Sequence, residues 1–506
     1  MYLITILAFA VLFWQADAPP SGIIVPQGDV FRTLLIVGLH PPLLALVAWL
    51  LARRAQAMLS GKPGNSHAAQ LAHHRATLSL RVATLLAFAA SVFLTNWVAL
   101  MNVSRGSPWL RIVGDILVLA PFLITIIAVW IAQFPLERKL RFVSDNDGTV
   151  AGFPPWTLRT YLDFNFRHHV LIVAVPLTII LFASNVLRGY EKQLQQWSGW
   201  VFMPDALLGI SAVGVFVSAP LMLTRIWRTI PLEQGTLRER LESICRLQGM
   251  KYNDIVVWPS AGMLINAAVM GIIAPVRYIL LSDGLISAMS NEQIEAVFGH
   301  EIGHIRHRHM QHFLVFAFVG WLIIAGLMEV LARAALNPNV PVALSLLSIQ
   351  AIGVVLTLVL WGVGFGWISR RFERQADRFG AWCVTPSAEN CSLPCSVHGV
   401  DRPIDEEKVR VCVTGASIFT SALNRVAQLN GIPHEERSWR HSSIGSRIRF
   451  LTSLAGDPTR AMKFDRMVRR TKMGMMVLAI LGSGICMYYW NETRVPAMVR
   501  LQAGSP

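Results

Sequence analysis

Residues 290–312 read SNEQIEAVFGHEIGHIRHRHMQH, and the apolar run 313–331 follows them directly. Within this stretch His300 and His304 lie four residues apart, a spacing that places both imidazoles on one face of a helix. Glu301 lies beside them and completes the pattern HExxH. The stretch therefore predicts a metal-binding helix that leads straight into a membrane span, and this combination decides the fold class.

A pair of neutral imidazoles suits zinc, whose catalytic sites use three protein ligands and leave one position for water. Glu301 is then placed to accept a proton from that water. The third ligand is expected where the chain leaves a later apolar run, in residues 369–377, SRRFERQAD. Here Glu373 is assigned to the metal, and Asp377, one turn on, to the second ring nitrogen of a liganding histidine. The alternative is that both carboxylates simply pair with the neighbouring arginines.

The composition of the 506 residues is that of a membrane protein, because 54% are hydrophobic and only 15% are charged. A helix needs roughly 20 apolar residues to cross the bilayer core, and about nine runs approach that length. They are residues 1–14, 33–51, 82–101, 112–132, 170–187, 206–224, 313–331, 342–368 and 474–490. The first run lacks the basic flank of a signal peptide. Residues 16–18 resemble a signal-peptide cleavage site, but the following Pro19 disfavours cleavage, so the run is interpreted as an uncleaved span.

Lysine and arginine exceed aspartate and glutamate by 45 to 30. The excess is concentrated in alternate loops, which indicates membrane topology rather than nucleic-acid binding, since basic loops stay in the cytoplasm. This orientation places residues 225–311 and 369–472 in the cytoplasm, with the chain in the cell (inner) membrane. At about 1.5 Å per helical residue, His304 lies about 13 Å before one span and Glu373 about 8 Å beyond another. We therefore expect the metal at the bilayer surface and polypeptide substrates that are embedded in or attached to the membrane.

The residues between the spans predict a mixed α/β domain that a transmembrane hairpin splits in two. Before the HExxH helix, a helix is expected over 237–247 and strands over 254–258, 264–270 and 278–282. Ser290 and Gln293 fit a capping box that opens the HExxH helix. The predicted organisation is a membrane region over 1–224, a first catalytic half over 225–311, the hairpin over 312–368, a second catalytic half over 369–472, and a C-terminal span with a short tail over 473–506.

Together these residues resemble the membrane zinc metallopeptidase family of HtpX and the CAAX prenyl proteases. The resemblance rests on Asn266 to Gly271, on YILLSDGL at 278–285, on HEIGH at 300–304, on ExxxAD around Glu373 and Asp377, and on His441 to Arg447. It implies an α-helical multi-pass membrane protein with a split cytoplasmic α/β zincin-like domain of the gluzincin type. His300, His304 and Glu373 would hold one Zn²⁺, and Glu301 would be the general base.

The resemblance also implies that His441 and Arg447 reach the site and stabilise a developing oxyanion. In the family a proline often follows this histidine, whereas Ser442 stands at that position here. The strand over 264–270 can pair with an extended peptide along its edge, so Asn266 is expected to contact substrate.

The function expected from the sequence is a zinc-dependent integral-membrane endopeptidase acting on membrane-associated or misfolded proteins, in quality control or processing. The alternatives are a membrane sensor-transducer whose proteolysis relays a signal, and a catalytically inactive scaffold. His307 and His309 are expected to be interfacial or to contact a ligand residue rather than the metal. Free thiols, disulfides and a second metal site all stay open for the cysteines at Cys383, Cys391, Cys395 and Cys412.

Overall fold

The computed structural model describes the chain in eleven segments, which fall into two compact units. The described residues are 5–8, 29–59, 66–101, 108–146, 157–262, 264–336, 346–384, 411–430, 432–436, 440–455 and 458–502. The first unit comprises Met1–Ile230 with Val257–Met263, and the second comprises Pro231–Val256 with Leu264–Pro506.

The first unit is helical. Its elements are α2 (Val30–Leu59), α3 (Ser66–Leu94), α4 (Trp97–Met101), α5 (Pro108–Asn146), α6 (Leu158–Asn165), the π-helix η1 (Phe166–Leu171), α7 (Ile172–Gly189), α8 (Glu191–Ser198) and α9 (Met203–Ile226). Aromatic side chains fill its core, where Phe88 packs on Phe122 with ring centroids 5.6 Å apart. The long helices of this unit match the predicted membrane region.

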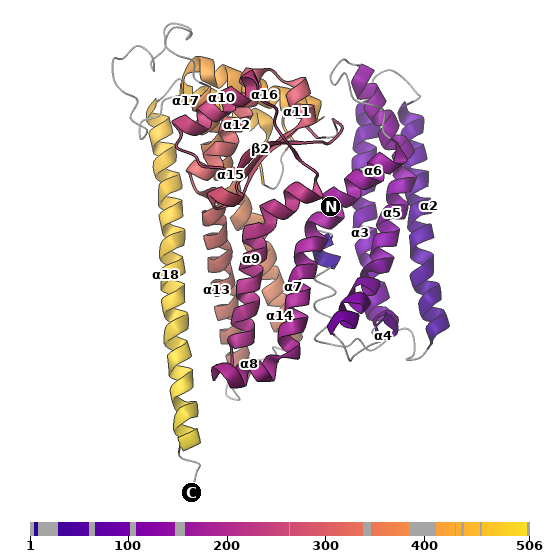
Figure 1. Ribbon diagram of the computed structural model, residues 1–506, viewed down its shortest axis with the longest axis vertical. Helices are drawn as coiled ribbons and strands as arrows, with labels where there is room; N and C mark the ends of the chain where they lie inside the picture. The colour runs from indigo at the N-terminus through magenta and orange to yellow at the C-terminus, as the bar shows by residue number, and fades with distance from the viewer. Residues whose placement is uncertain are drawn as a thin grey trace. The chain divides into compact units, whose positions relative to one another are not determined.

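The second unit contains a small sheet and the remaining helices (Figure 1). Its helices are α10 (Thr236–Leu247), the 3₁₀ turn η2 (Ala274–Val276), α11 (Asp283–Ala288), α12 (Asn291–Arg306), α13 (His309–Leu336), α14 (Leu346–Val359), the π-helix η3 (Leu360–Phe365), α15 (Gly366–Cys383), α16 (Val413–Leu429), α17 (Ile444–Ala455) and α18 (Pro458–Gln502). A buried cluster of Phe316, Phe372 and Val468 joins α13, α15 and α18. These three helices therefore share one core.

The sheet has four strands, β1 (Ile230–Pro231), β2 (Asp254–Trp258), β3 (Ala267–Met270) and β4 (Tyr278–Ser282), in the order β1-β2-β4-β3. Strand β3 pairs with β4 in antiparallel register, from Ala267 opposite Leu281 to Met270 opposite Tyr278. Four of the five residues of β4 are buried, as expected for an inner strand. The hairpin expected from the sequence is thus confirmed, and β3 forms an edge of the sheet.

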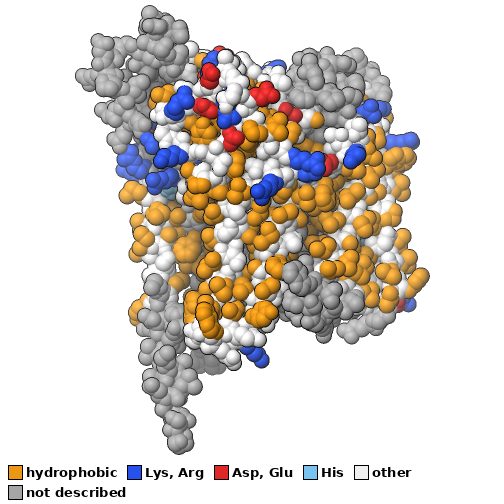
Figure 2. Space-filling view, in the orientation of Figure 1, with side chains coloured by type: hydrophobic (Ala, Val, Ile, Leu, Met, Phe, Trp, Pro, Cys, Tyr) orange, Lys and Arg blue, Asp and Glu red, His pale blue; other side chains and the backbone are white. Residues whose placement is uncertain are grey.

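Seven helices in the described part of the chain are long and apolar enough to cross a membrane. They are Val30–Leu59, Leu71–Leu94, Val113–Leu140, Leu158–Gly189, Met203–Ile226, His309–Arg333 and Ile352–Cys383. Each of them carries exposed large hydrophobic side chains, and such side chains cover much of the face drawn in Figure 2. The predicted run 474–490 lies within α18, and most of 1–14 lies outside the described residues. The multi-pass helical fold is confirmed, and seven of the nine expected spans correspond to these helices.

One predicted span is displaced along the chain. The run 82–101 was expected as a single helix, but α3 ends at Leu94 and a separate turn, α4, follows. The hydroxyl of Thr95 accepts a hydrogen bond from the backbone N–H of Trp97 at 3.2 Å, which favours a turn over a continuing helix. The helix instead begins earlier, at Ser66, so the apolar segment extends over Leu71–Leu94.

Helices α12 and α15 pack with their backbones almost in contact, because glycines face each other across the interface. A Cβ atom on Gly303 would lie 3.1 Å from the Cα of Ala376. A Cβ atom on Gly380 would lie 2.9 Å from both the backbone nitrogen of His300 and the backbone oxygen of Ala296. Separations below 3.0 Å leave no room for a methyl group, so the spacing of these two helices requires glycine at position 380.

We expect Gly380→Ala to destabilise the protein by at least about 2 kcal/mol, because the added methyl would clash with the backbone of α12 and with the ring of Phe419 on α16. Thermal unfolding of the purified protein in detergent measures this effect. Gly326→Ala on α13 is the matched control, since a Cβ there meets nothing within 4 Å. Equal melting temperatures for the two variants would show that this close packing does not matter.

Candidate active site

The two histidines of the HExxH pattern lie on α12, which begins as the sequence predicts. Ser290 caps the helix: its hydroxyl accepts from the backbone N–H of Gln293, and the side chain of Gln293 accepts from the backbone of Ser290. This capping box sets the start of α12. His300 is 9% exposed and His304 is partly exposed, so both face the interior of the second unit.

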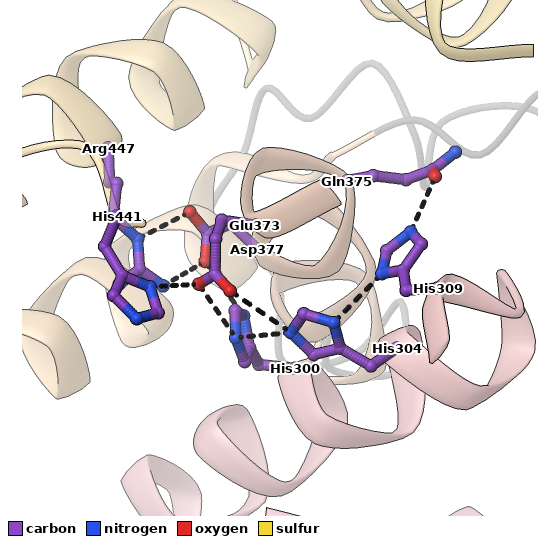
Figure 3. A network of polar contacts seen from close by, with 8 residues as sticks. All are labelled: His300, His304, His309, Glu373, Gln375, Asp377, His441 and Arg447. Atoms are coloured by element: carbon purple, nitrogen blue, oxygen red, sulfur yellow. Dashed lines mark hydrogen bonds and ion pairs between the residues drawn. The ribbon is translucent and has the colours of Figure 1, made fainter. Parts of the chain in front are cut away.

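Glu373 of α15 completes a group of three side chains that fits a metal ion (Figure 3). The Nε2 atoms of His300 and His304 lie 3.2 Å apart, and they lie 3.6 and 3.7 Å from the carboxylate oxygens of Glu373. Ligands bound tetrahedrally at about 2.0–2.1 Å would be separated by about 3.4 Å. The observed separations therefore match a zinc-sized site with three protein ligands.

The protonation of the two histidines follows from their surroundings. Burial lowers the pKa of His304 to about 4, which leaves a neutral imidazole of the kind that binds metal. Burial also acts against charge on His300, but the carboxylates of Asp377 and Glu373 outweigh it and raise the pKa of His300. A cation bound between the three side chains would take the place of that proton.

Asp377 lies where the sequence predicts, next to the ring nitrogen of His300 that faces away from Glu373. Its Oδ1 atom is 2.9 Å from Nδ1 of His300, and the carboxylate is fully buried. Arg447 of α17 forms a two-pronged ion pair with the same carboxylate, with its Nε atom 2.8 Å from Oδ2. Arg447 thus compensates the buried charge of Asp377, a contact that the sequence did not predict.

Glu301 points from α12 toward the edge strand β3. Burial, together with the negative charge of Glu373, raises the pKa of Glu301 to about 7, while a backbone hydrogen bond from Val269 partly opposes the rise. A carboxyl group with a pKa close to neutral is suited to accepting and returning a proton.

His441 precedes α17 and reaches the group of three from the opposite side to α12 (Figure 3). Its Nδ1 atom lies 3.0 Å from Oε2 of Glu373, and 46% of its side chain is exposed. The structure therefore brings His441 to the centre, as predicted. Half of its ring stays accessible to a bound molecule.

A further chain of contacts leads from His304 to α18, and sequence reasoning missed it. Nδ1 of His304 lies 2.9 Å from Nδ1 of His309, and Nε2 of His309 lies 3.0 Å from Oε1 of Gln375. Lys472 donates to the same Oε1 atom at 3.1 Å. Because Lys472 can only donate, the atom of Gln375 that it contacts must be the amide oxygen. His309 therefore donates to that oxygen from Nε2, and its Nδ1 atom accepts from the N–H group at Nδ1 of His304. This leaves Nε2 of His304 with a free lone pair directed at the metal position.

The turn between α12 and α13 makes this chain possible. Arg308 has a φ of 54°, in the left-handed region that non-glycine residues rarely adopt. The reversal turns His309 back toward His304 instead of leaving it one helical turn away, and the ring of His309 stacks on Phe372 at 4.3 Å. The sequence placed His309 correctly outside the ligand set, but its partner Gln375 comes from a distant helix and carries no local signal.

Asn266, Cys383 and Cys412 are the remaining predicted residues that the structure describes. Asn266 is exposed immediately before β3, and its backbone N–H donates to the hydroxyl of Ser282 at 3.0 Å. Cys383 and Cys412 form no disulfide in the described part of the chain. Cys391 and Cys395 lie outside the described residues.

Comparisons with known proteins agree with this arrangement. Residues 231–399 match the model of Peptidase family M48. CAAX prenyl protease 1 of Saccharomyces cerevisiae is 30% identical over 206 residues, which cover 40% of this chain and 44% of that protein. A protease HtpX homologue of Archaeoglobus fulgidus is 25% identical over 246 residues, which cover 44% of this chain and 71% of that protein. The chain thus spans less than half the length of the yeast relative.

The crystal structure of S. mikatae Ste24p is similar in fold, with a TM-score of 0.50 and 16% sequence identity. The similarity covers 83% of this chain and 99% of that one. At this identity the match shows the fold alone. Together with the sequence matches it confirms the predicted resemblance and the fold class, a multi-pass helical membrane protein that carries a metallopeptidase-like domain.

We expect His309→Leu to weaken zinc binding about 10- to 100-fold, because Nδ1 of His304 loses the group that holds its tautomer. His309→Asn should retain most of the affinity, since Oδ1 of asparagine takes the position of Nδ1 and still accepts the proton. Chelator competition on the purified protein measures both. His312→Leu removes a nearby histidine that bonds only the backbone of Arg308, and it should leave affinity unchanged. A loss of affinity in His312→Leu as large as in His309→Leu would contradict the assignment.

Proposed function

We propose that this protein is a zinc-dependent integral-membrane endopeptidase that hydrolyses peptide bonds in membrane-associated or misfolded polypeptides. The observation that carries the proposal is the spacing of His300, His304 and Glu373 at the separations of tetrahedral ligands, with Glu301 beside them. The match of residues 231–399 to a peptidase family supports the same reaction.

The proposed mechanism assigns one task to each side chain. His300, His304 and Glu373 would hold a zinc ion, which would supply Lewis-acid polarisation of the scissile carbonyl and acidify water in the centre. Glu301 accepts the proton of the attacking water and returns it to the leaving amine. The exposed part of His441 donates to the oxygen that becomes negative in the transition state, as an oxyanion donor does.

The role of Arg447 in this mechanism differs from the oxyanion stabilisation that the sequence resemblance implies. Its guanidinium is bound to Asp377, which in turn contacts His300. We therefore assign Arg447 and Asp377 to holding His300 in the orientation that binds zinc. Arg447 can still add positive charge to the centre, because its pKa is raised by the neighbouring carboxylates and it stays charged.

The substrate is proposed to bind as an extended strand along β3. This strand is an edge of the sheet, and the backbone of Val269 lies close enough to hydrogen-bond Glu301. A peptide that paired with β3 would pass directly beside the general base. Asn266, exposed at the start of β3, would then contact the bound chain.

The location of the centre favours substrates at a membrane. α12 is followed after one turn by the apolar helix α13, and α15 continues from the apolar helix α14 through η3. The distribution of arginine and lysine supports a cytoplasmic position for the centre, at the surface of the cell (inner) membrane.

We expect Glu301→Gln to abolish cleavage while zinc stays bound, because the amide keeps the shape of the carboxylate but cannot accept a proton. Zinc content is measured by metal analysis, and cleavage with a fluorogenic peptide or an unfolded membrane protein. Mass spectrometry of polypeptides that co-purify with the inactive variant identifies substrates. If the variant supports the same cellular function as the parent protein, the chain acts as a scaffold and not as an enzyme.

We expect Glu373→Ala to lose zinc as well as activity, since two histidines alone leave the ion without its charged ligand. Glu436→Ala is a suitable control because it removes an exposed carboxylate that is not part of the group of three. Stoichiometric zinc and unimpaired cleavage in Glu373→Ala would contradict the assigned ligand set.

A further inference from the structure

A cavity of about 470 Å³ lies beside the metal centre, and its walls are polar and basic. It is lined by Arg370, Arg374, His441, Ser442, Ser443, Ser446 and Arg449. His441 also contacts Glu373, so one side chain separates the cavity from the proposed metal position. No acidic residue lines the cavity in the described part of the chain.

Positive charge predominates in this cavity, because three arginines and no acidic residue line it in the described part of the chain. Arg449 is paired with Glu435, at 2.8 Å, but Arg374 has no acidic partner among the ion pairs of the described residues. Nη2 of Arg374 donates to the hydroxyl of Ser446 at 3.2 Å, whereas its buried Nε atom has no hydrogen-bond partner in the described structure. Arg370 and Arg374 lie four residues apart on α15 and both border the cavity, so their like charges repel each other. An anion in the cavity would reduce the repulsion between the arginines and would accept a hydrogen bond from Nε of Arg374.

The amino-terminal end of helix α17 adds to the positive potential in the cavity. Ser443 immediately precedes this helix and Ser446 lies in its first turn, and Oγ of Ser443 accepts from the backbone N–H of Ser446 at 3.2 Å. The amino-terminal end of a helix carries partial positive charge and attracts anions. The cavity therefore combines two guanidinium groups, hydroxyl donors and a helix amino-terminus.

We propose that this cavity is a subsite for a carboxylate of the polypeptide substrate, located beside the scissile bond. The inference rests on the proposed peptidase function and specifies its substrate class. The guanidinium of arginine matches a carboxylate with two parallel hydrogen bonds, and a partly buried pair of this kind is stronger than one in open solvent. Because His441 belongs to both the cavity and the centre, a group bound there is part of the molecule being cleaved. An acidic residue near the scissile bond is therefore the preferred ligand.

The test compares peptides that differ only in one carboxylate, bound to the zinc-loaded Glu301→Gln protein. A series of otherwise neutral peptides carries Asp or Asn at successive positions, and fluorescence anisotropy gives the affinities. At one position or two adjacent positions, Asp should bind at least about tenfold more tightly than Asn. A second pair, with a free or an amidated C-terminus, shows whether a terminal carboxylate serves equally well. No preference at any position would overturn the proposal.

Variants then locate the preference in the cavity. Arg370→Gln and Arg374→Gln should each reduce the ratio of Asp to Asn affinities toward one, while the affinity for the Asn peptides stays the same. Arg371→Gln is the matched control, because the substitution removes the same charge from the same helix. The side chain of Arg371 stacks on Trp367 and does not line the cavity. If Arg371→Gln reduces the ratio equally, general electrostatics and not the cavity accounts for the effect. In case Arg374→Gln fails to fold, competition by inorganic phosphate against the Asp peptide tests the unaltered cavity, and unchanged affinity at high phosphate would contradict it.

Three outcomes separate this inference from others. If the arginine changes weaken binding to vesicles containing anionic phospholipid but leave peptide preference intact, the cavity holds a lipid headgroup and the proposal is wrong. If the protein with Glu301 intact cleaves neutral peptides at the same rate as acidic ones, the peptidase function stands and the subsite fails. If it binds the acidic peptides preferentially but cleaves nothing, the subsite stands and the peptidase function fails.

Discussion

The close approach of α12 and α15 is the constraint on which the centre depends. Gly303 and Gly380 allow the two backbones to meet, and the distance between the helices then brings Glu373 within reach of His300 and His304. A bulkier residue would separate the carboxylate from the imidazoles by more than a tetrahedral site tolerates. Helix packing with small residues thus sets metal geometry here, as it sets helix approach within membranes.

Burial of charge is the second consequence of this packing. Two carboxylates, Glu373 and Asp377, are removed from water, and a buried charge without a partner is strongly destabilising. Arg447 compensates Asp377, while His441 contacts Glu373 and a bound cation would compensate its charge. The same removal from water raises the pKa of Glu301 to about 7, which suits the role of general base proposed for it. Stability and catalytic preparation therefore have one physical origin.

The centre is also connected to helices that reach well beyond it. α13 and α18 pack together, and Lys472 of α18 bonds both Gln375 and the backbone oxygen of His307. Through His309 this contact extends to a metal ligand. The tautomer of His304 is therefore determined by residues on three helices rather than by the HExxH segment alone. On the other side of Glu373, His441 links the centre to the basic cavity.

The sequence by itself determined the helix of the HExxH pattern, its capping box, the sheet hairpin and the apolar spans, because each is a local pattern with a fixed period. It also indicated Glu373 and Asp377, since two carboxylates one helical turn apart share a face. Only the tertiary structure decided that Arg447 binds Asp377, that Lys472 and Gln375 orient His309, and that three arginines border one cavity. These contacts join helices remote in sequence, and no local period records which side chains meet when glycine-lined helices pack. The displaced span around Thr95 shows the same limit, because a single side-chain hydrogen bond ended a helix that hydropathy alone would have continued.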